Sequence, residues 1–127
     1  MRIAPIDKSK LAKSDQEYKE LAASDADWII RSVEDLNYLR ENDKDGVFAK
    51  LPEPDFKAFA NSLIFKQGAN AGGTYKFLMP SLTLTEIFEV FEHFGMAREY
   101  FSETLEEKCT AAGCKFSFWD YCSSALC

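Results

Sequence analysis

The sequence has a single histidine, His93, and no cysteine before residue 109. It has no apolar run that approaches the ~20 residues needed to span a bilayer, so we expect no membrane span. Lysine and arginine number 15 against 21 acidic residues, which gives a net charge of −6, and no basic stripe offsets it. Because nucleic acids and anionic lipid surfaces are negatively charged, this balance disfavours both as partners.

The N-terminus lacks the apolar core of a secretory signal, which predicts a cytoplasmic protein, with secretion after processing as the alternative. The chain of 127 residues is long enough to form one domain with its own buried core. Hydrophobic residues make up 46% of it, a share that argues against disorder of the whole chain.

Capping residues and helical periodicity predict an all-α fold, a small bundle of four or five helices. Ser14 with Glu17, and Thr83 with Glu86, have the spacing of capping boxes, and Ser24 is expected to cap another helix. The helices are predicted over about residues 14–23, 24–41, 55–64, 83–94 and 96–108.

The predicted organisation has three parts. Residues 1–13 form a flexible N-terminal arm, residues 14–108 a helical domain, and residues 109–127 a largely irregular tail. Within the helical domain, the glycine-rich run 68–73 is interpreted as a flexible link. Phe116, Phe118 and Trp119 could add a strand to the tail, but serine and glycine dilute that signal.

All four cysteines lie in the tail, with the spacing C-x4-C-x7-C-x4-C. Four thiolates at such gaps could close a structural zinc site, because a turn between paired cysteines aims both sulfurs at one metal. Alternatively they form two disulfides, for which three pairings are open. Both interpretations use the same residues, Cys109, Cys114, Cys122 and Cys127.

A third interpretation makes the tail a substrate for modification or cross-linking. The cysteines are interleaved with Thr110, Ser117, Ser123 and Ser124, and dehydrated hydroxyl residues can form thioethers with cysteine. An acidic helical segment followed by a short Cys/Ser/Thr/aromatic segment resembles, in layout, precursors of ribosomally made, post-translationally modified peptides. The resemblance implies a leader-like helical domain, a core-like tail, and a non-catalytic precursor without cofactor, whose partner is a modifying enzyme or another protein.

Two further patterns lie outside the tail. Glu41, Asp43 and Asp45 alternate before Gly46, as at the start of an EF-hand calcium loop, but position 12 is proline where that loop needs a bidentate glutamate. A helical interaction protein with this degenerate loop is a further alternative. His93 follows Glu86 and Glu89 on one helix face, which is expected to be solvated.

Overall fold

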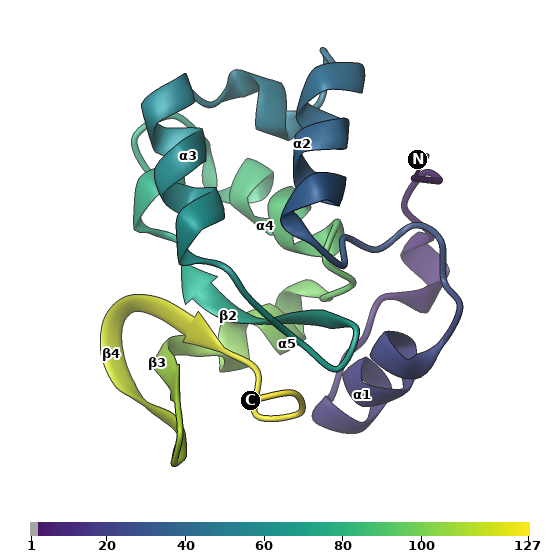
Figure 1. Ribbon diagram of the computed structural model, residues 1–127, viewed down its shortest axis with the longest axis vertical. Helices are drawn as coiled ribbons and strands as arrows, with labels where there is room; N and C mark the ends of the chain where they lie inside the picture. The colour runs from purple at the N-terminus through teal and green to yellow at the C-terminus, as the bar shows by residue number, and fades with distance from the viewer. Residues whose placement is uncertain (1–2) are drawn as a thin grey trace.

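The computed structural model describes residues 3–127, and it shows five α-helices and a four-stranded antiparallel sheet around one core. The helices α2, α3 and α4 lie above the sheet, and α1 lies beside it (Figure 1). None of the helices in this range is long and apolar enough to cross a membrane. The α-helices are Asp15–Ala23 (α1), Val33–Asn42 (α2), Glu53–Ser62 (α3), Leu84–Glu92 (α4) and Arg98–Glu103 (α5).

The prediction of an all-α fold with an irregular tail is therefore wrong. The sheet has the order β1-β2-β4-β3, with every neighbouring pair antiparallel. Two of its strands come from segments that were predicted to be a flexible link and an irregular tail. The strands are Ile64–Lys66 (β1), Ala69–Thr74 (β2), Leu105–Thr110 (β3) and Gly113–Cys122 (β4).

The glycine-rich run is a central strand because its neighbour leaves no room for larger side chains. A Cβ atom on Gly72 would lie 2.9 Å from the carbonyl oxygen of Tyr121, and one on Gly73 would lie 3.1 Å from the Tyr121 hydroxyl. Glycine inside a strand often marks such a close approach of two backbones. Small residues in β2 thus reflect dense packing against β4.

Of the predicted helices, the one that starts at Thr83 is confirmed in detail, because Thr83 and Glu86 form the reciprocal capping box. Ser14 caps α1 as predicted, although the Glu17 carboxylate accepts from the backbone N–H of Lys13 rather than from that of Ser14. The helix predicted from 96 to 108 is cut short: α5 ends at Glu103, and the chain continues into β3.

The segment between α1 and α2 was expected to be helical, but it is an irregular loop with several bends. The Arg31 guanidinium donates hydrogen bonds to the carbonyl oxygens of Ala22, Ser24, Ala26 and Gly68, at 2.8–3.0 Å. These carbonyl oxygens therefore have hydrogen-bond donors without the backbone N–H groups that a helix would provide. The actual cap of α2 is Ser32, eight residues beyond the predicted Ser24.

A buried polar network joins the N-terminal half of the chain to its C-terminal strand. The side chain of Asn70, on β2, is fully buried; its Oδ1 accepts from the Tyr121 hydroxyl at 2.7 Å, and its amide donates to the carbonyl oxygens of Ile64 and Gly72. The Tyr18 hydroxyl, on α1, donates to the backbone carbonyl of Asn70 at 2.7 Å. This network fixes β4 against β2.

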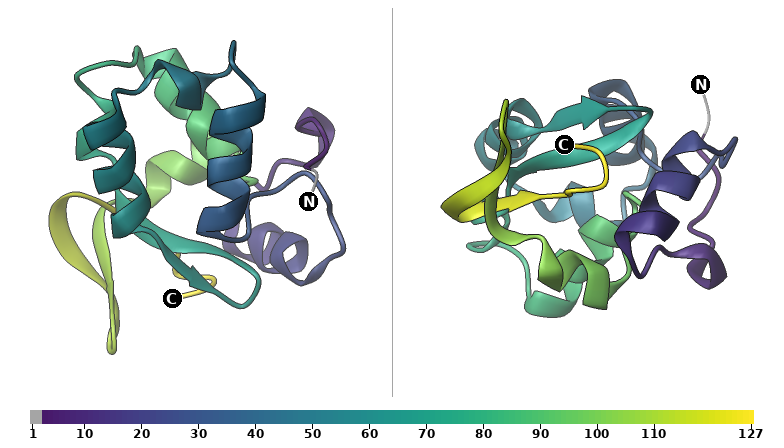
Figure 2. Two further views of the ribbon diagram at one scale, coloured as in Figure 1. Left: turned by 45° about the horizontal axis from the view of Figure 1, so that its top comes forward. Right: turned by 90° about the horizontal axis from the view of Figure 1, so that it is seen from below.

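The N-terminal segment and the C-terminus are also held by backbone hydrogen bonds. Ala12, which is buried, exchanges bonds with Gly95 and Ala97. After β4, the backbone N–H of Ser123 donates to the carbonyl oxygen of Ala71 at 2.8 Å, and the view from below shows this last segment running beside β2 (Figure 2). Residues 1 and 2 of the predicted arm lie outside the described range.

The network predicts a specific loss of stability in the variant Tyr121→Phe. Removing the hydroxyl leaves the buried Oδ1 of Asn70 without a donor, which should lower the free energy of unfolding by about 1–3 kcal/mol. Urea unfolding measures this change. The matched control is Tyr38→Phe on α2, a half-buried tyrosine outside the network, whose effect should stay within about 0.5 kcal/mol. Equal effects of the two changes would contradict the role given to the network.

Candidate functional site: a disulfide-braced aromatic arch

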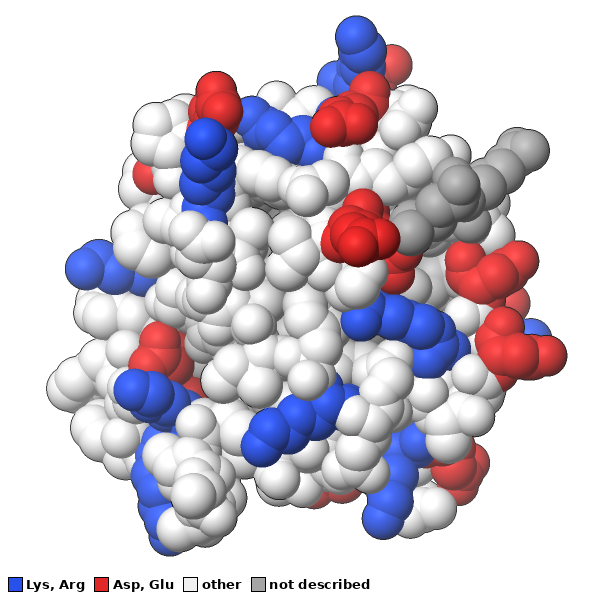
Figure 3. Space-filling view, viewed as in Figure 1, with Lys and Arg blue, Asp and Glu red and all other residues white. Residues whose placement is uncertain are grey.

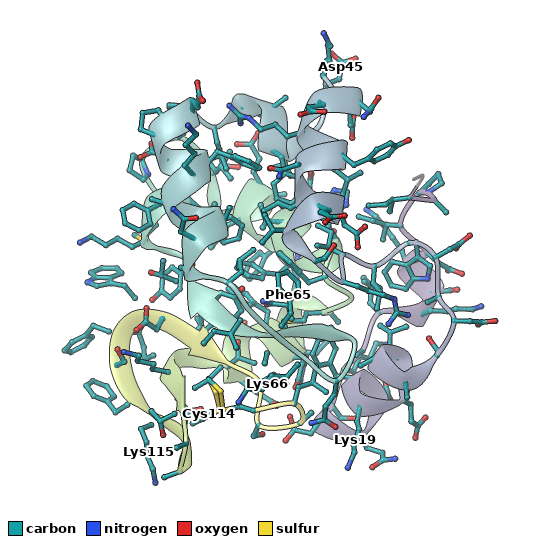
Figure 4. All side chains as sticks on the ribbon, in the orientation of Figure 1. Lys19, Asp45, Phe65, Lys66, Cys114 and Lys115 are labelled. Carbon is teal, nitrogen blue, oxygen red and sulfur yellow. A yellow bond between two sulfur atoms is a disulfide. The ribbon has the colours of Figure 1, made fainter. Side chains whose placement is uncertain are left out.

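The four cysteines form two disulfides, Cys109–Cys127 and Cys114–Cys122, with Cα separations of 5.7 and 5.8 Å. The pairing selects one of the three that the sequence left open. Cys109 and Cys114 face each other across the β3–β4 hairpin, yet each is bonded to a cysteine nearer the C-terminus. The second disulfide is drawn at Cys114 in Figure 4.

The Cys114–Cys122 disulfide joins two ends of the same strand. Eight residues of extended chain would separate the two Cα atoms by about 26 Å, at roughly 3.3 Å per residue. The observed separation is 5.8 Å, so β4 must bend back on itself, and the yellow ribbon at the lower left of Figure 1 shows this curve.

The bend lies where the β3–β4 register slips. Leu105 pairs with Tyr121 and Glu107 pairs with Phe116, so that the single residue Glu106 faces four residues, 117–120. We refer to residues 116–120 as the aromatic arch. Trp119, within the arch, and Glu106 opposite it both have positive φ, 69° and 62°. This conformation is uncommon for residues other than glycine, and it persists only where the surroundings impose it.

Glu106 holds the arch in place. One of its carboxylate oxygens accepts from the backbone N–H of Trp119 at 2.9 Å, and the other accepts from the Tyr75 hydroxyl. Burial and this carboxylate raise the pKa of Tyr75 to about 12, so the phenol stays protonated as a donor. The Trp119 carbonyl oxygen in turn accepts from the Thr74 hydroxyl at 2.7 Å and from the backbone N–H of Tyr75 at 2.9 Å.

The arch exposes three large aromatic side chains. Phe116 is 71% exposed, Phe118 is 68% exposed and Trp119 is 45% exposed. The rings of Phe116 and Phe118 pack edge to face with their centroids 4.8 Å apart, and Tyr75 packs edge to face on Trp119. Clustered exposed apolar side chains of this kind mark interaction sites on soluble proteins.

The charge around the arch differs from that of the rest of the surface. Lys108 and Lys115 are exposed and are paired across the hairpin beside it. In Figure 3, the arch lies at the lower left, where most atoms are uncharged and both basic and acidic side chains lie beside them, and further acidic side chains lie along the right-hand edge. Among the charged residues of the β3–β4 hairpin, the exposed ones are thus Lys108 and Lys115, whereas Glu106, Glu107 and Asp120 are half-buried.

The hydroxyl residues predicted as modification sites have different environments. Ser123 is fully buried and shares a hydrogen bond of 2.6 Å with the Tyr100 hydroxyl. Ser117 donates to Asp120 within the arch, Ser124 donates to Asp15 on α1, and Thr110 donates to the Gly113 carbonyl in the hairpin turn. In the folded protein each of them has a structural hydrogen bond, and Ser123 is inaccessible to an enzyme.

The residues of the calcium-like pattern lie far from the cysteines. Asp45 is at the opposite end of the molecule from Cys114 (Figure 4). Glu41 lies in the last turn of α2, and Asp43 forms its C-cap. Within residues 3–127, the one group of three or more metal-ligand side chains whose ligand atoms gather within 4.8 Å is Cys109, Cys122 and Cys127. The carboxylates of the acidic loop do not form such a group.

His93 is not on a solvated face, in contrast to the expectation from sequence. It forms the C-cap of α4, and its ring is partly buried against Phe48, with centroids 5.2 Å apart. Burial lowers the pKa of His93 to about 4, and the nearby Asp43 opposes this shift only in part.

The sequence patterns missed the residues that shape the arch. Glu106 and Trp119 carry no motif, and their conformations depend on the slip in register. The alternation of Phe116 and Phe118 with Ser117 was the available signal, because it places both phenylalanines on one face of a strand. Comparison of the chain with protein-family models, curated proteins and solved structures finds no significant match.

The two disulfides should contribute unequally to stability. In the chain-entropy model the stabilisation grows with the length of the closed loop, and the sequence separations are 18 for Cys109–Cys127 and 8 for Cys114–Cys122. We expect the pair Cys109→Ala/Cys127→Ala to lower the free energy of unfolding by about 3 kcal/mol, and the pair Cys114→Ala/Cys122→Ala by about 2.5 kcal/mol.

Urea unfolding followed by far-UV circular dichroism measures these changes. The control is the wild-type protein in a phosphine reductant without metal, which should lose the contributions of both disulfides. Unchanged unfolding midpoints in both alanine pairs would contradict the assigned disulfides.

His93 predicts a dependence of stability on pH. Its pKa is about 4 in the folded protein and about 6.5 in the unfolded chain, so between these values the unfolded chain binds more protons. Stability should therefore fall as pH decreases from about 6.5 to 4, by up to about 3 kcal/mol from this group. Unfolding of wild type and His93→Gln across this range isolates the contribution; parallel curves would contradict it.

Proposed function

We propose that this is a non-catalytic binding protein that presents the aromatic arch to a protein partner. The observation that carries the proposal is the exposure of Phe116, Phe118 and Trp119 on a segment held rigid by a disulfide and by Glu106. A cluster of exposed aromatic side chains marks an interaction site on a soluble protein. Aromatic residues are also enriched among the residues that contribute most of the binding energy at protein interfaces.

Rigidity supports a binding role as much as exposure does. A segment that is already fixed in its bound shape loses little conformational entropy on association, so more of the contact energy contributes to affinity. The Cys114–Cys122 disulfide links the residues on either side of the arch. The backbone of Trp119, within the arch, is hydrogen-bonded to Glu106, Thr74 and Tyr75.

The charges beside the arch define the partner further. Lys108 and Lys115 flank the aromatic side chains, and complementary charge at the rim of an interface steers association and selects partners. We infer a partner protein with an apolar recess and an acidic rim. A second copy of this chain fits less well, because both copies carry a net charge of −6.

The precursor role inferred from the layout of the sequence stays a prediction. It would require the modifying enzyme to act before folding, because Cys122 is 2% exposed and Ser123 is fully buried in the folded chain. The two disulfides already cross-link all four cysteines that were predicted as modification or cross-link sites. The binding role needs no other modification, and it uses the folded protein.

The triple variant Phe116→Ser/Phe118→Ser/Trp119→Ser tests the binding role. All three side chains are exposed, so the fold should persist, while affinity for the partner should fall at least about 30-fold, the equivalent of one interface hot spot. The matched control is Met79→Ser/Leu84→Ser, which removes two exposed apolar side chains that lie outside the arch.

The oxidised protein is immobilised on a resin, and an extract of the cells that produce it is passed over the resin. A protein retained by wild type and control, but lost with the triple variant, is identified, purified and titrated against all three forms. Equal affinities for the three forms would contradict the proposal. So would arch-dependent self-association in sedimentation, or arch-dependent binding to phosphatidylcholine vesicles, since either would assign the arch to another kind of partner.

A further inference from the structure

The two disulfides lie side by side, and three of their four sulfur atoms form one cluster. The sulfurs of Cys109, Cys122 and Cys127 all lie within 4.8 Å of one another, although Cys122 is not bonded to either of the others. The fourth sulfur, that of Cys114, is bonded to Cys122 but lies outside this group of three.

Three of the four sulfurs already lie close to the spacing that a four-thiolate zinc site requires. In a tetrahedral site with Zn–S bonds of about 2.3 Å, the sulfurs are about 3.8 Å apart. Breaking the two S–S bonds would let each bonded pair separate to that distance, while Cys122 is already within 4.8 Å of the other disulfide. Cys114 is paired with Cys109 across the hairpin, so rotation of its side chain after reduction would bring its sulfur toward the other three.

The backbone of the four cysteines is held by contacts that do not involve sulfur. The Cys122 N–H donates to the Thr104 carbonyl, and the Cys127 N–H donates to the Ser123 carbonyl, both at 2.9 Å. Between them Leu126 is buried in the core. Cys109 and Cys114 are held opposite each other by the pairing of β3 with β4. The four sulfurs should therefore stay close together after reduction.

We propose that the reduced protein binds one Zn²⁺ through the thiolates of Cys109, Cys114, Cys122 and Cys127, so that these residues form a redox-dependent metal site. The oxidised state described here and the zinc-bound state would be alternatives for the same four residues. The site does not depend on the binding role of the arch. Lys108 and Lys115, each next to a cysteine in the sequence, provide positive charge near the doubly negative zinc–thiolate centre.

The chemistry balances with a dithiol as the reductant. Each protein disulfide takes two electrons and two protons from one dithiol, which is oxidised to its own disulfide, so two dithiols yield four protein thiols. Zn²⁺ then replaces the four thiol protons and forms four Zn–S bonds, since thiolates are the ligands. In the reverse direction, two molecules of a small-molecule disulfide would accept four electrons from the bound thiolates and become four small-molecule thiols with protons from water, while the two protein disulfides re-form and Zn²⁺ is released.

The test uses the full chain reduced by a water-soluble phosphine. Each protein disulfide oxidises one phosphine to its phosphine oxide, whose oxygen atom comes from water, and the phosphine does not compete for zinc as a thiol. Zn²⁺ is titrated against a chromophoric chelator, and Co²⁺ serves as a spectroscopic probe of tetrahedral thiolate ligation. We expect one metal per chain, protection of all four cysteines from alkylation, and no binding by the oxidised protein.

The variants Cys114→Ser and Cys127→Ser should each weaken zinc binding at least about tenfold, whereas the control Ser124→Ala, an exposed position in the same segment, should bind like wild type. Circular dichroism follows the fold in the same samples. Folding of a reduced, unfolded chain on addition of one Zn²⁺ would also support the site. Absence of stoichiometric binding, or binding unaffected by both cysteine changes, would overturn the proposal whether or not the reduced chain is folded.

Discussion

The pairing of β2 with β4, fixed by the hydrogen bond from Tyr121 to the buried side chain of Asn70, is the constraint on which the rest of the structure depends. It brings the C-terminal strand to the middle of the sheet, between β2 and β3. Because buried amides must find partners, Asn70 leaves few alternatives for the position of β4. Gly73, opposite Tyr121, and the neighbouring Gly72 allow the two strands to approach closely.

The position of β4 in turn determines the site. Once Tyr121 is fixed, the Cys114–Cys122 disulfide leaves the residues between them no extended path, and they bulge outward as the arch. The exposed aromatic side chains are therefore a consequence of how the strand is anchored at both ends. Glu106 sits inside the bend and supplies the hydrogen bonds that such a bulge would otherwise lack.

Local signals in the sequence were sufficient for part of this structure. The capping box of Thr83 and Glu86 predicted α4, since it depends only on neighbouring residues. The strands were missed because their evidence is not local: Gly72 and Gly73 have the composition of a linker, and only Tyr121, about fifty residues later, explains them. Ser24 does not cap a helix, because the Arg31 side chain donates hydrogen bonds to the carbonyl oxygens of the irregular loop that follows it. The cysteines indicated the region of the candidate site. The exposure of its aromatic residues, however, depends on a slip in the β3–β4 register, which residue spacing does not predict.

Mapping the disulfides of protein isolated from the cells that make it tests the central claim most directly, because both the bent strand and the arch require one particular pairing. Proteolysis without reduction, followed by tandem mass spectrometry, should give Cys109 linked to Cys127 and Cys114 linked to Cys122, and an intact mass lower than that of the reduced chain by four hydrogens, two for each disulfide. A Cys109–Cys114 link across the hairpin, or a mass lowered by loss of water from serine or threonine, would contradict the structure of the arch.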